Sequence, residues 1–181
     1  MRRWILRNKF SHDFNTFFND VADDIATAVH AAIAGTGAEQ TITTGITHPD
    51  VPRNATITTT NVAAPSGNVL IYGWTALGIY TSESLAIIAG SLRAGWTPFV
   101  TIDTIVIPAG VTAADTVSVG IGQRLGLTKY IQATTDVIKV VKNGTSISYT
   151  AYLDNVVAVG ALTAGDDFVI YYYDNWNSGA Y

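Results

Sequence analysis

The feature that most constrains this chain is a period of two in its side chains, which begins at Thr41 and continues almost to the C-terminus. Over residues 96–107, Phe99 and Ile105 would lie on one face and Val106 on the other. Successive side chains of a β-strand point to opposite faces in this way. Such segments recur at roughly ten-residue spacing, with no helical pattern between them. The sequence therefore predicts a mainly β protein, an antiparallel β-sandwich of about eight or nine strands, and excludes βαβ folds.

Turn residues separate the predicted strands, as at residues 65–67 and 108–110. The strongest turn signal is Asn143-Gly144, because both residue types tolerate the positive φ angles of a two-residue hairpin. The segments that we predict as strands are residues 41–43, 54–60, 68–73, 79–88, 96–107, 116–119, 136–142, 145–153 and 168–173.

The N-terminal part of the chain has a different periodicity, with apolar residues three and four positions apart. This spacing predicts an amphipathic α-helix over residues 11–34, with Ser11 as its N-cap and Gly35 just after its end. The helix would pack either on its own domain or against neighbouring copies of the chain. Its apolar stripe consists of Phe14, Phe17, Phe18, Val21, Ile25, Val29 and Ile33.

Basic residues are concentrated at the N-terminus, where Arg2, Arg3, Arg7 and Lys9 surround Trp4. One interpretation is an arm that docks on an acidic partner surface, or less favourably on nucleic acid, and the other is a solvated terminus. We group residues 1–38 as a basic arm and helix for attachment or oligomerisation. Residues 39–181 then form the antiparallel β-domain.

The composition indicates a protein that contacts other chains. Only 13% of the 181 residues are charged, and 24 are Thr. Surfaces with so few charges are poorly protected against association. The absence of Cys excludes disulfides, Cys-based zinc sites and thiol nucleophiles.

The C-terminal eleven residues are strongly aromatic and include Tyr171, Tyr173, Trp176 and Tyr181. Tyr and Trp bury a large area at low entropy cost, so they are common at recognition surfaces. The tail is therefore predicted to be either a protein interface or a last core strand with an anchored end. A carbohydrate-binding platform is a further alternative.

The residues that could support catalysis are few and scattered. Gly120, Gly122 and Gly126 do not have the spacing of a dinucleotide-binding loop, and simply predict a bulge or tight turn. The three His residues lack metal-ligand spacing, and Asp50 after His48-Pro49 is best explained as a loop cap. No apolar run is long enough for a transmembrane helix. We therefore expect no enzymatic activity, no cofactor, no metal and no membrane partner.

Two stretches carry a family resemblance. Residues 44–54 read TGITHPDVPRN, and residues 115–127 read DTVSVGIGQRLGL. Together they resemble a recurrent family of tailed-bacteriophage virion proteins, over about residues 29–128. Residues 72–80 depart from the family pattern, because they are more aromatic than its polar hairpin.

The resemblance implies a structural role in the virion, as a capsid decoration, cement or minor capsid protein. A tail tube, tail tip or fibre component is the alternative. The implied partners are the major capsid protein or other virion proteins, and the implied location is the virion, assembled in the host cytoplasm. Particle symmetry favours a homo-oligomer, with a trimer as the expected state.

Overall fold

The computed structural model describes residues 12–174, apart from residues 24 and 153. These residues form thirteen strands and one 3-10 turn, arranged as two antiparallel sheets of four and nine strands. The prediction of a mainly β, sandwich-like protein is therefore confirmed. The predicted N-terminal helix is wrong, since the described part of the chain contains no α-helix.

The strands vary from three to sixteen residues in length. Their bounds are β1 (His12–Val21), β2 (His30–Ala34), β3 (Gln40–Ile42), β4 (Arg53–Thr59), β5 (Asn68–Thr75), β6 (Tyr80–Ala86), β7 (Arg93–Ile107), β8 (Thr116–Ile131), β9 (Val137–Lys142), β10 (Thr145–Ile147), β11 (Thr150–Tyr152), β12 (Asp154–Ala158) and β13 (Asp166–Asp174), with the 3-10 turn η1 (Thr134–Asp136) before β9.

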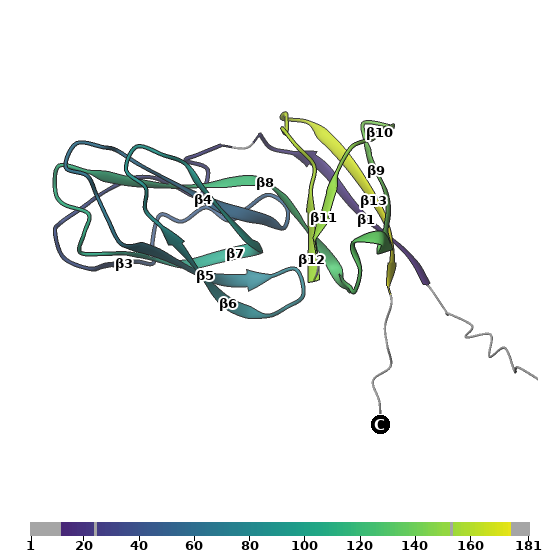
Figure 1. Cartoon of the computed structure of the whole chain (residues 1–181), viewed down its shortest axis with the longest axis horizontal. Coiled ribbons are helices and arrows are strands. Elements are labelled where there is room, and N and C mark those ends of the chain that lie inside the picture. Colours follow the sequence, from purple (N-terminus) through teal and green to yellow (C-terminus); the bar gives the residue numbers. More distant parts are fainter. Residues whose placement is uncertain (1–11, 24, 153, 175–181) are drawn as a thin grey trace, which may run out of the picture.

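The strands build two lobes, each with its own hydrophobic core (Figure 1). The first lobe contains β2 to β7 and the first half of β8. The second lobe contains β1, the second half of β8 and β9 to β13. In the second lobe, the four-stranded sheet β1-β13-β9-β10 packs on the β8-β12-β11 end of the larger sheet.

The long strand β8 belongs to both lobes. Its Val117 and Val119 enter the first core, whereas Leu125 and Leu127 enter the second. In the first half β8 pairs with β2 and β4, and in the second half it pairs with β12. The two cores are thus connected by one continuous strand.

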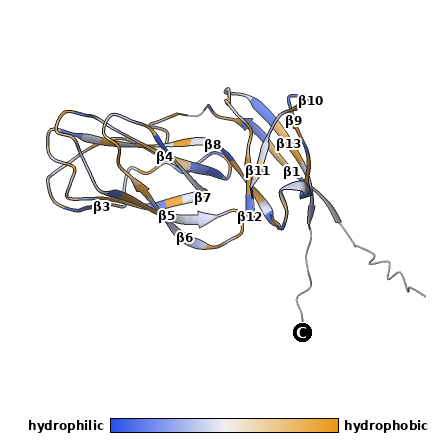
Figure 2. Cartoon of the chain, in the orientation of Figure 1, coloured by the Kyte–Doolittle hydropathy of each residue, from blue (hydrophilic) through white to orange (hydrophobic). Residues whose placement is uncertain are grey.

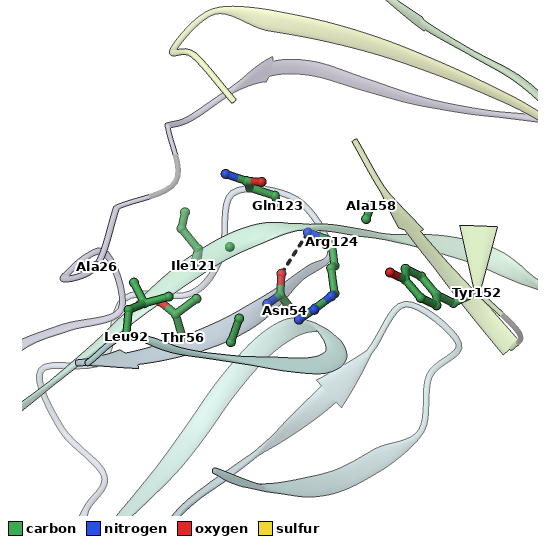
Figure 3. Close-up of a pocket in the computed structure, with 11 residues that line it drawn as sticks. Ala26, Asn54, Thr56, Leu92, Ile121, Gln123, Arg124, Tyr152 and Ala158 are labelled. Carbon is green, nitrogen blue, oxygen red and sulfur yellow. Dashed lines mark hydrogen bonds between the residues drawn. The ribbon is translucent and has the colours of Figure 1, made fainter. Parts of the chain in front are cut away.

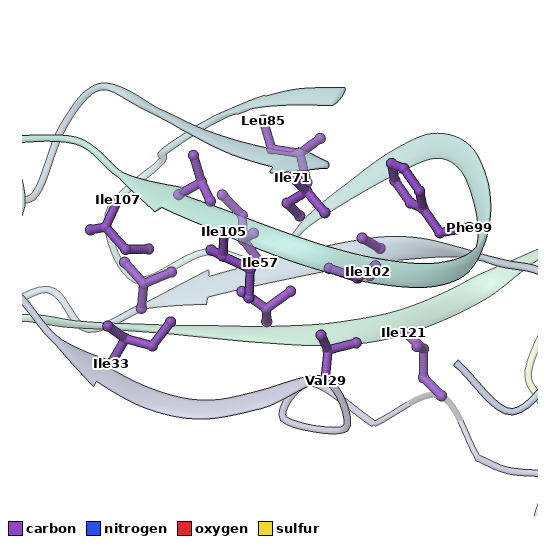
Figure 4. Packing of buried hydrophobic residues seen from close by; sticks show 14 of the residues in the cluster. Val29, Ile33, Ile57, Ile71, Leu85, Phe99, Ile102, Ile105, Ile107 and Ile121 are labelled. Atoms are coloured by element: carbon purple, nitrogen blue, oxygen red, sulfur yellow. The ribbon is translucent and has the colours of Figure 1, made fainter. Parts of the chain in front are cut away.

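Side-chain alternation produces the first core only in part as the sequence predicted, because a register shift on β7 between Ile102 and Thr104 places Ile102 in the same core as Ile105 and Ile107. Ile102, Ile105 and Ile107 of β7 are fully buried and face Ile57 of β4 and Ile71 of β5 (Figure 4). Hydrophobic and hydrophilic positions alternate along the strands of both lobes (Figure 2). Burial of β-branched side chains on one face of each strand stabilises the sandwich.

The N-terminal apolar stripe is explained by a β-bulge rather than by a helix. Phe18 pairs with Phe168, and Val21 pairs with Asp166, so β1 carries one extra residue between these pairs. Asp20 adopts a φ of 51° within the bulge. The extra residue turns both Phe18 and Val21 into the second core, although they are three positions apart. The bulge therefore reproduces the spacing of a helix.

The rest of the predicted helix divides between a connection and β2. Val29 and Ile33 are buried, but in the first core, not in the second with Phe18. The stripe thus joins residues from two different lobes. The apolar residues from 14 to 33 look like one stripe in the sequence, but they do not form one surface in the structure.

Several predicted turns and strands behave as the sequence indicated. Asn143 and Gly144 have φ angles of 50° and 79°, and they connect β9 to β10 as a hairpin. The predicted strand at 145–153 is divided into β10 and β11, while β1, β2 and β12 were not predicted. Among the described residues, no helix is long and apolar enough to cross a membrane.

Candidate functional site

The two ends of the described chain meet at one edge of the four-stranded sheet. His12 at the start of β1 pairs with Asp174 at the end of β13 (Figure 1). The basic arm and the aromatic tail adjoin these two residues in the sequence. Six of the predicted interaction residues, Arg2, Arg3, Trp4, Arg7, Trp176 and Tyr181, lie outside the described residues.

Of the other predicted interaction residues, Phe17, Phe18, Val21, Tyr171 and Tyr173 divide between the two faces of this sheet. Phe17 is 63% exposed, whereas Phe18 and Val21 are core residues of the second lobe. Tyr171 and Tyr173 are half-buried, and the intervening Tyr172 is fully buried. Phe14 pairs with Tyr172, and Ile25 is 44% exposed in the connection after β1.

On the outer face of the four-stranded sheet, Tyr171 of this set lies beside two polar residues of the neighbouring strands. In register, Asn15, Tyr171 and Lys139 form one row across β1, β13 and β9. Lys139 Nζ lies 4.3 Å from the centre of the Tyr171 ring. This cation–π contact covers one face of the ring, so Tyr171 offers less surface for stacking a ligand.

The first motif of the resemblance folds into the junction between the lobes. The Arg53 side chain is fully buried, and its guanidinium donates hydrogen bonds to the carbonyls of Ala22 and Gly122. It also contacts the Asp50 carboxylate at 3.2 Å, and that carboxylate accepts a hydrogen bond from the Ala22 amide. Arg53 and Asp50 thereby hold the connection after β1 against β8.

The glycines of the second motif allow close packing at the same junction. A Cβ on Gly122 would lie 2.7 Å from the Asn54 amide nitrogen, and one on Gly120 would lie 2.2 Å from the Ile25 carbonyl oxygen. Asn54 itself accepts a hydrogen bond from the Arg124 amide and donates one to the Gly95 carbonyl. These residues form the middle of β8, where the pairing with β4 shifts register between Ile121 and Leu125. Of the predicted bulge or tight turn, the bulge is therefore confirmed.

Asp115 anchors a loop at the far end of the first lobe. Burial by itself would raise the pKa of Asp115. Hydrogen bonds from the amides of Ala63 and Val62 and from the hydroxyls of Thr60 and Thr112 outweigh burial, so they lower the pKa below its usual range. Asp115 is thus a structural carboxylate, which stays charged at neutral pH.

A groove of about 530 Å³ lies between the β5–β6 hairpin of the first lobe and the second lobe. Trp96 of β7 lines it from one side, and Tyr130 of β8 and Tyr152 of β11 line it from the other. Among the described residues that line the groove, Asp154 is the one with a charged side chain. The aromatic residues of this groove come from three strands that are distant in the sequence, so sequence reasoning did not find it.

A second pocket of about 320 Å³ adjoins the groove at Tyr152, which lines both (Figure 3). Asn54, Gln123 and Arg124 supply its polar groups. Figure 3 shows the Tyr152 ring entering this pocket with its hydroxyl turned toward Arg124. The groove and the pocket therefore form two compartments that meet at one tyrosine.

Trp96 is held in place by its neighbours. The Arg124 guanidinium lies 3.8 Å from the centre of the indole ring, and Tyr152 meets the ring at an interplanar angle of 75°. The Glu83 carboxylate accepts hydrogen bonds from the Trp96 and Thr97 amides. Burial raises the pKa of Glu83, and these hydrogen bonds and the Arg124 charge oppose the shift only in part.

No group of three or more His, Asp or Glu residues suited to a metal ion occurs in the described part of the chain. The Asp166 carboxylate is buried and lies 2.6 Å from the Lys142 ammonium. Burial would raise the pKa of Asp166, but Lys142, the Thr163 amide and Asn143 lower it below its usual range. This pair fastens the end of β9 to the start of β13.

Comparison with known proteins gives no relative for this chain. No family model, no curated protein sequence and no solved structure matches it.

Proposed function

We propose that this protein is a non-enzymatic structural component of a bacteriophage virion, which binds the capsid as a decoration, cement or minor capsid protein. The observation that carries the proposal is the pairing of β1 with β13. It places His12 and Asp174, which adjoin the basic arm and the end of the aromatic tail in the sequence, side by side at one end of the four-stranded sheet. A single attachment end can then bind the particle while the first lobe projects from it.

The surface chemistry supports the same role. The exposed strand positions are rich in Thr and Ser and poor in Lys and Glu. A neutral surface of this kind suits a protein that works in many copies beside one another. Attachment to a repeating lattice makes weak individual contacts strong through multivalency. A homo-oligomer, with a trimer favoured, fits the threefold axes of such a lattice.

The test is cosedimentation of the purified protein with undecorated capsids and, separately, with isolated tails. We expect the full chain to sediment with capsids. Deletion of residues 1–10 is expected to weaken this binding and to leave the melting temperature nearly unchanged, because those residues precede β1. Sedimentation with tails and never with capsids would replace the capsid role by the tail component role. Binding to neither particle would refute the proposal.

A further inference from the structure

The groove between the lobes contains polar groups that the protein itself does not use. Among the described residues, the hydroxyls of Tyr130 and Tyr152 and the carboxylate of Asp154 have no hydrogen-bond partner. Tyr130 is 50% exposed and Asp154 is exposed. Unused donors and acceptors that converge on one concavity are typical of ligand sites, where a few polar groups fix the orientation of the ligand.

The same groove offers aromatic surfaces beside those polar groups. Trp96 is 49% exposed, although Arg124 covers one face of its ring. Tyr152 packs against the Trp96 ring with 4.7 Å between the ring centroids, and Tyr130 lines the groove from the second lobe. A ligand that satisfies this lining needs apolar faces for the rings and hydroxyl groups at its edges for the tyrosines and Asp154.

Saccharides have this combination, because each sugar ring has an apolar C–H face and a rim of hydroxyls. We propose that the groove binds a neutral oligosaccharide of at least two sugar rings, which crosses Tyr152 from the larger compartment into the smaller one. The larger compartment, about 530 Å³, lies within the range of about 300–1000 Å³ that is typical of ligand pockets.

Charge argues against anionic ligands in this groove. Asp154 is the charged residue of the larger compartment, and it would repel a phosphate or a uronic acid. The Arg124 guanidinium in the smaller compartment is engaged with the Trp96 ring and the Gly95 carbonyl. A fully apolar ligand would bury the tyrosine hydroxyls and the carboxylate without partners, which is unfavourable. A neutral saccharide avoids both the repulsion by Asp154 and the burial of polar groups without hydrogen-bond partners.

The Trp96 side of the groove is also preorganised for binding. Stacking by Arg124 and the hydrogen bonds of Glu83 to the backbone at Trp96 and Thr97 fix the Trp96 ring before any ligand arrives. A fixed ring loses little conformational freedom on binding, so less affinity is lost to ordering the site. This site is separate from the attachment end, and the inference does not depend on the virion role.

The test begins with the full chain on an array of neutral and acidic oligosaccharides, followed by titration of the strongest neutral binder against tryptophan fluorescence. We expect neutral saccharides to bind. Tyr152→Ala and Tyr130→Ala are each expected to weaken binding by roughly tenfold or more. Trp74→Ala is the matched control, because Trp74 is 47% exposed and stacks with Tyr80 outside the groove lining.

Several results would overturn the inference: no binding to any saccharide, binding confined to acidic saccharides, or unchanged affinity in both tyrosine variants. Loss of binding on deletion of residues 175–181, with the tyrosine variants intact, would assign binding to the aromatic tail instead. If Tyr152→Ala does not fold, Tyr130→Ala and Tyr152→Phe decide the question. The Tyr130→Ala variant should still cosediment with capsids as the wild type does. If the groove binds no saccharide, the proposed virion role is therefore unaffected.

Discussion

Arg53 and Asp115 show how the charged residues of this chain are used. Each is buried and surrounded by hydrogen-bond partners from the backbone, and each fixes a connection between strands. Both lie in the motifs that carry the resemblance, and neither lies in the groove. Arg53 and Asp115 therefore stabilise the fold, whereas Tyr130 and Tyr152, the two tyrosines assigned to ligand recognition, lie outside those motifs.

Replacement of Arg53 should be strongly destabilising. Arg53→Met keeps much of the apolar volume but leaves the carbonyls of Ala22 and Gly122 without their donors. We expect a loss of about 2–4 kcal/mol in the free energy of unfolding, measured by chemical denaturation. Arg93→Met is the control, because Arg93 is exposed, and it should change stability by less than about 0.5 kcal/mol. Equal effects would refute the role of Arg53 at the junction.

Asp115→Asn should reduce stability in a pH-dependent way. The hydrogen bonds to Asp115 lower its pKa in the folded state below the unfolded value of about 3.9. The charged form therefore stabilises the fold above that value, and this contribution disappears as the pH falls through the lower folded pKa. Denaturation midpoints of wild type and Asp115→Asn should differ most at neutral pH and converge in acid.

The control for this comparison is Asp103→Asn. Asp103 lies on β7 and has no hydrogen-bonding side-chain partner among the described residues. Its midpoint should follow wild type at every pH. A constant difference between Asp115→Asn and wild type down to strong acid would contradict the assignment.

At the scale of elements, β1 shows how a strand can imitate a helix. A regular strand would bury residues 16, 18 and 20, but the bulge after Phe18 buries Val21 in place of Asp20. The resulting apolar step of three, from Phe18 to Val21, matches a helical stripe. The bulge depends on pairing with β13, about 150 positions away, so local periodicity does not reveal it.

Adjacent phenylalanines on β1 provide a test of this strand. Phe18→Ala removes a side chain from the second core and should cost about 3–5 kcal/mol of unfolding free energy. Phe17 is 63% exposed, so Phe17→Ala should cost less than about 0.5 kcal/mol. The free energies of unfolding of the two variants are compared by thermal or chemical denaturation. Similar losses would be inconsistent with alternation along β1.

At the scale of the whole molecule, the sequence predicted the strands well and their assembly poorly. All nine predicted segments coincide at least partly with observed strands, because alternation and turns such as Asn143-Gly144 are local. The division into two lobes depends on β8 crossing both cores, and the glycines there indicated only a bulge or tight turn. The groove requires Trp96, Tyr130 and Tyr152 to converge from separate strands, and no local pattern records that convergence.

Two N-terminal deletions should separate attachment from folding. Removal of residues 1–21 deletes all of β1, exposes β13 and takes Phe18 and Val21 from the second core. We expect the melting temperature to fall sharply and the apolar surface to bind a hydrophobic dye. Removal of residues 1–10 leaves β1 in place and should not have this effect. Equal melting temperatures for the two deletions would show that β1 is dispensable.

The pairing of the first strand with the last also determines when each lobe can fold on the ribosome. The first lobe ends within β8, so all its strands are available while the rest of the chain is still being synthesised. The second lobe must wait, since contacts such as that of Thr16 with Tyr172 join residues 156 positions apart. Such non-local pairing is slow, and β1 stays without its partner until synthesis is nearly finished. Under the proposed function, the attachment end is the part of the fold completed last, so particle binding would wait until β13 has been made.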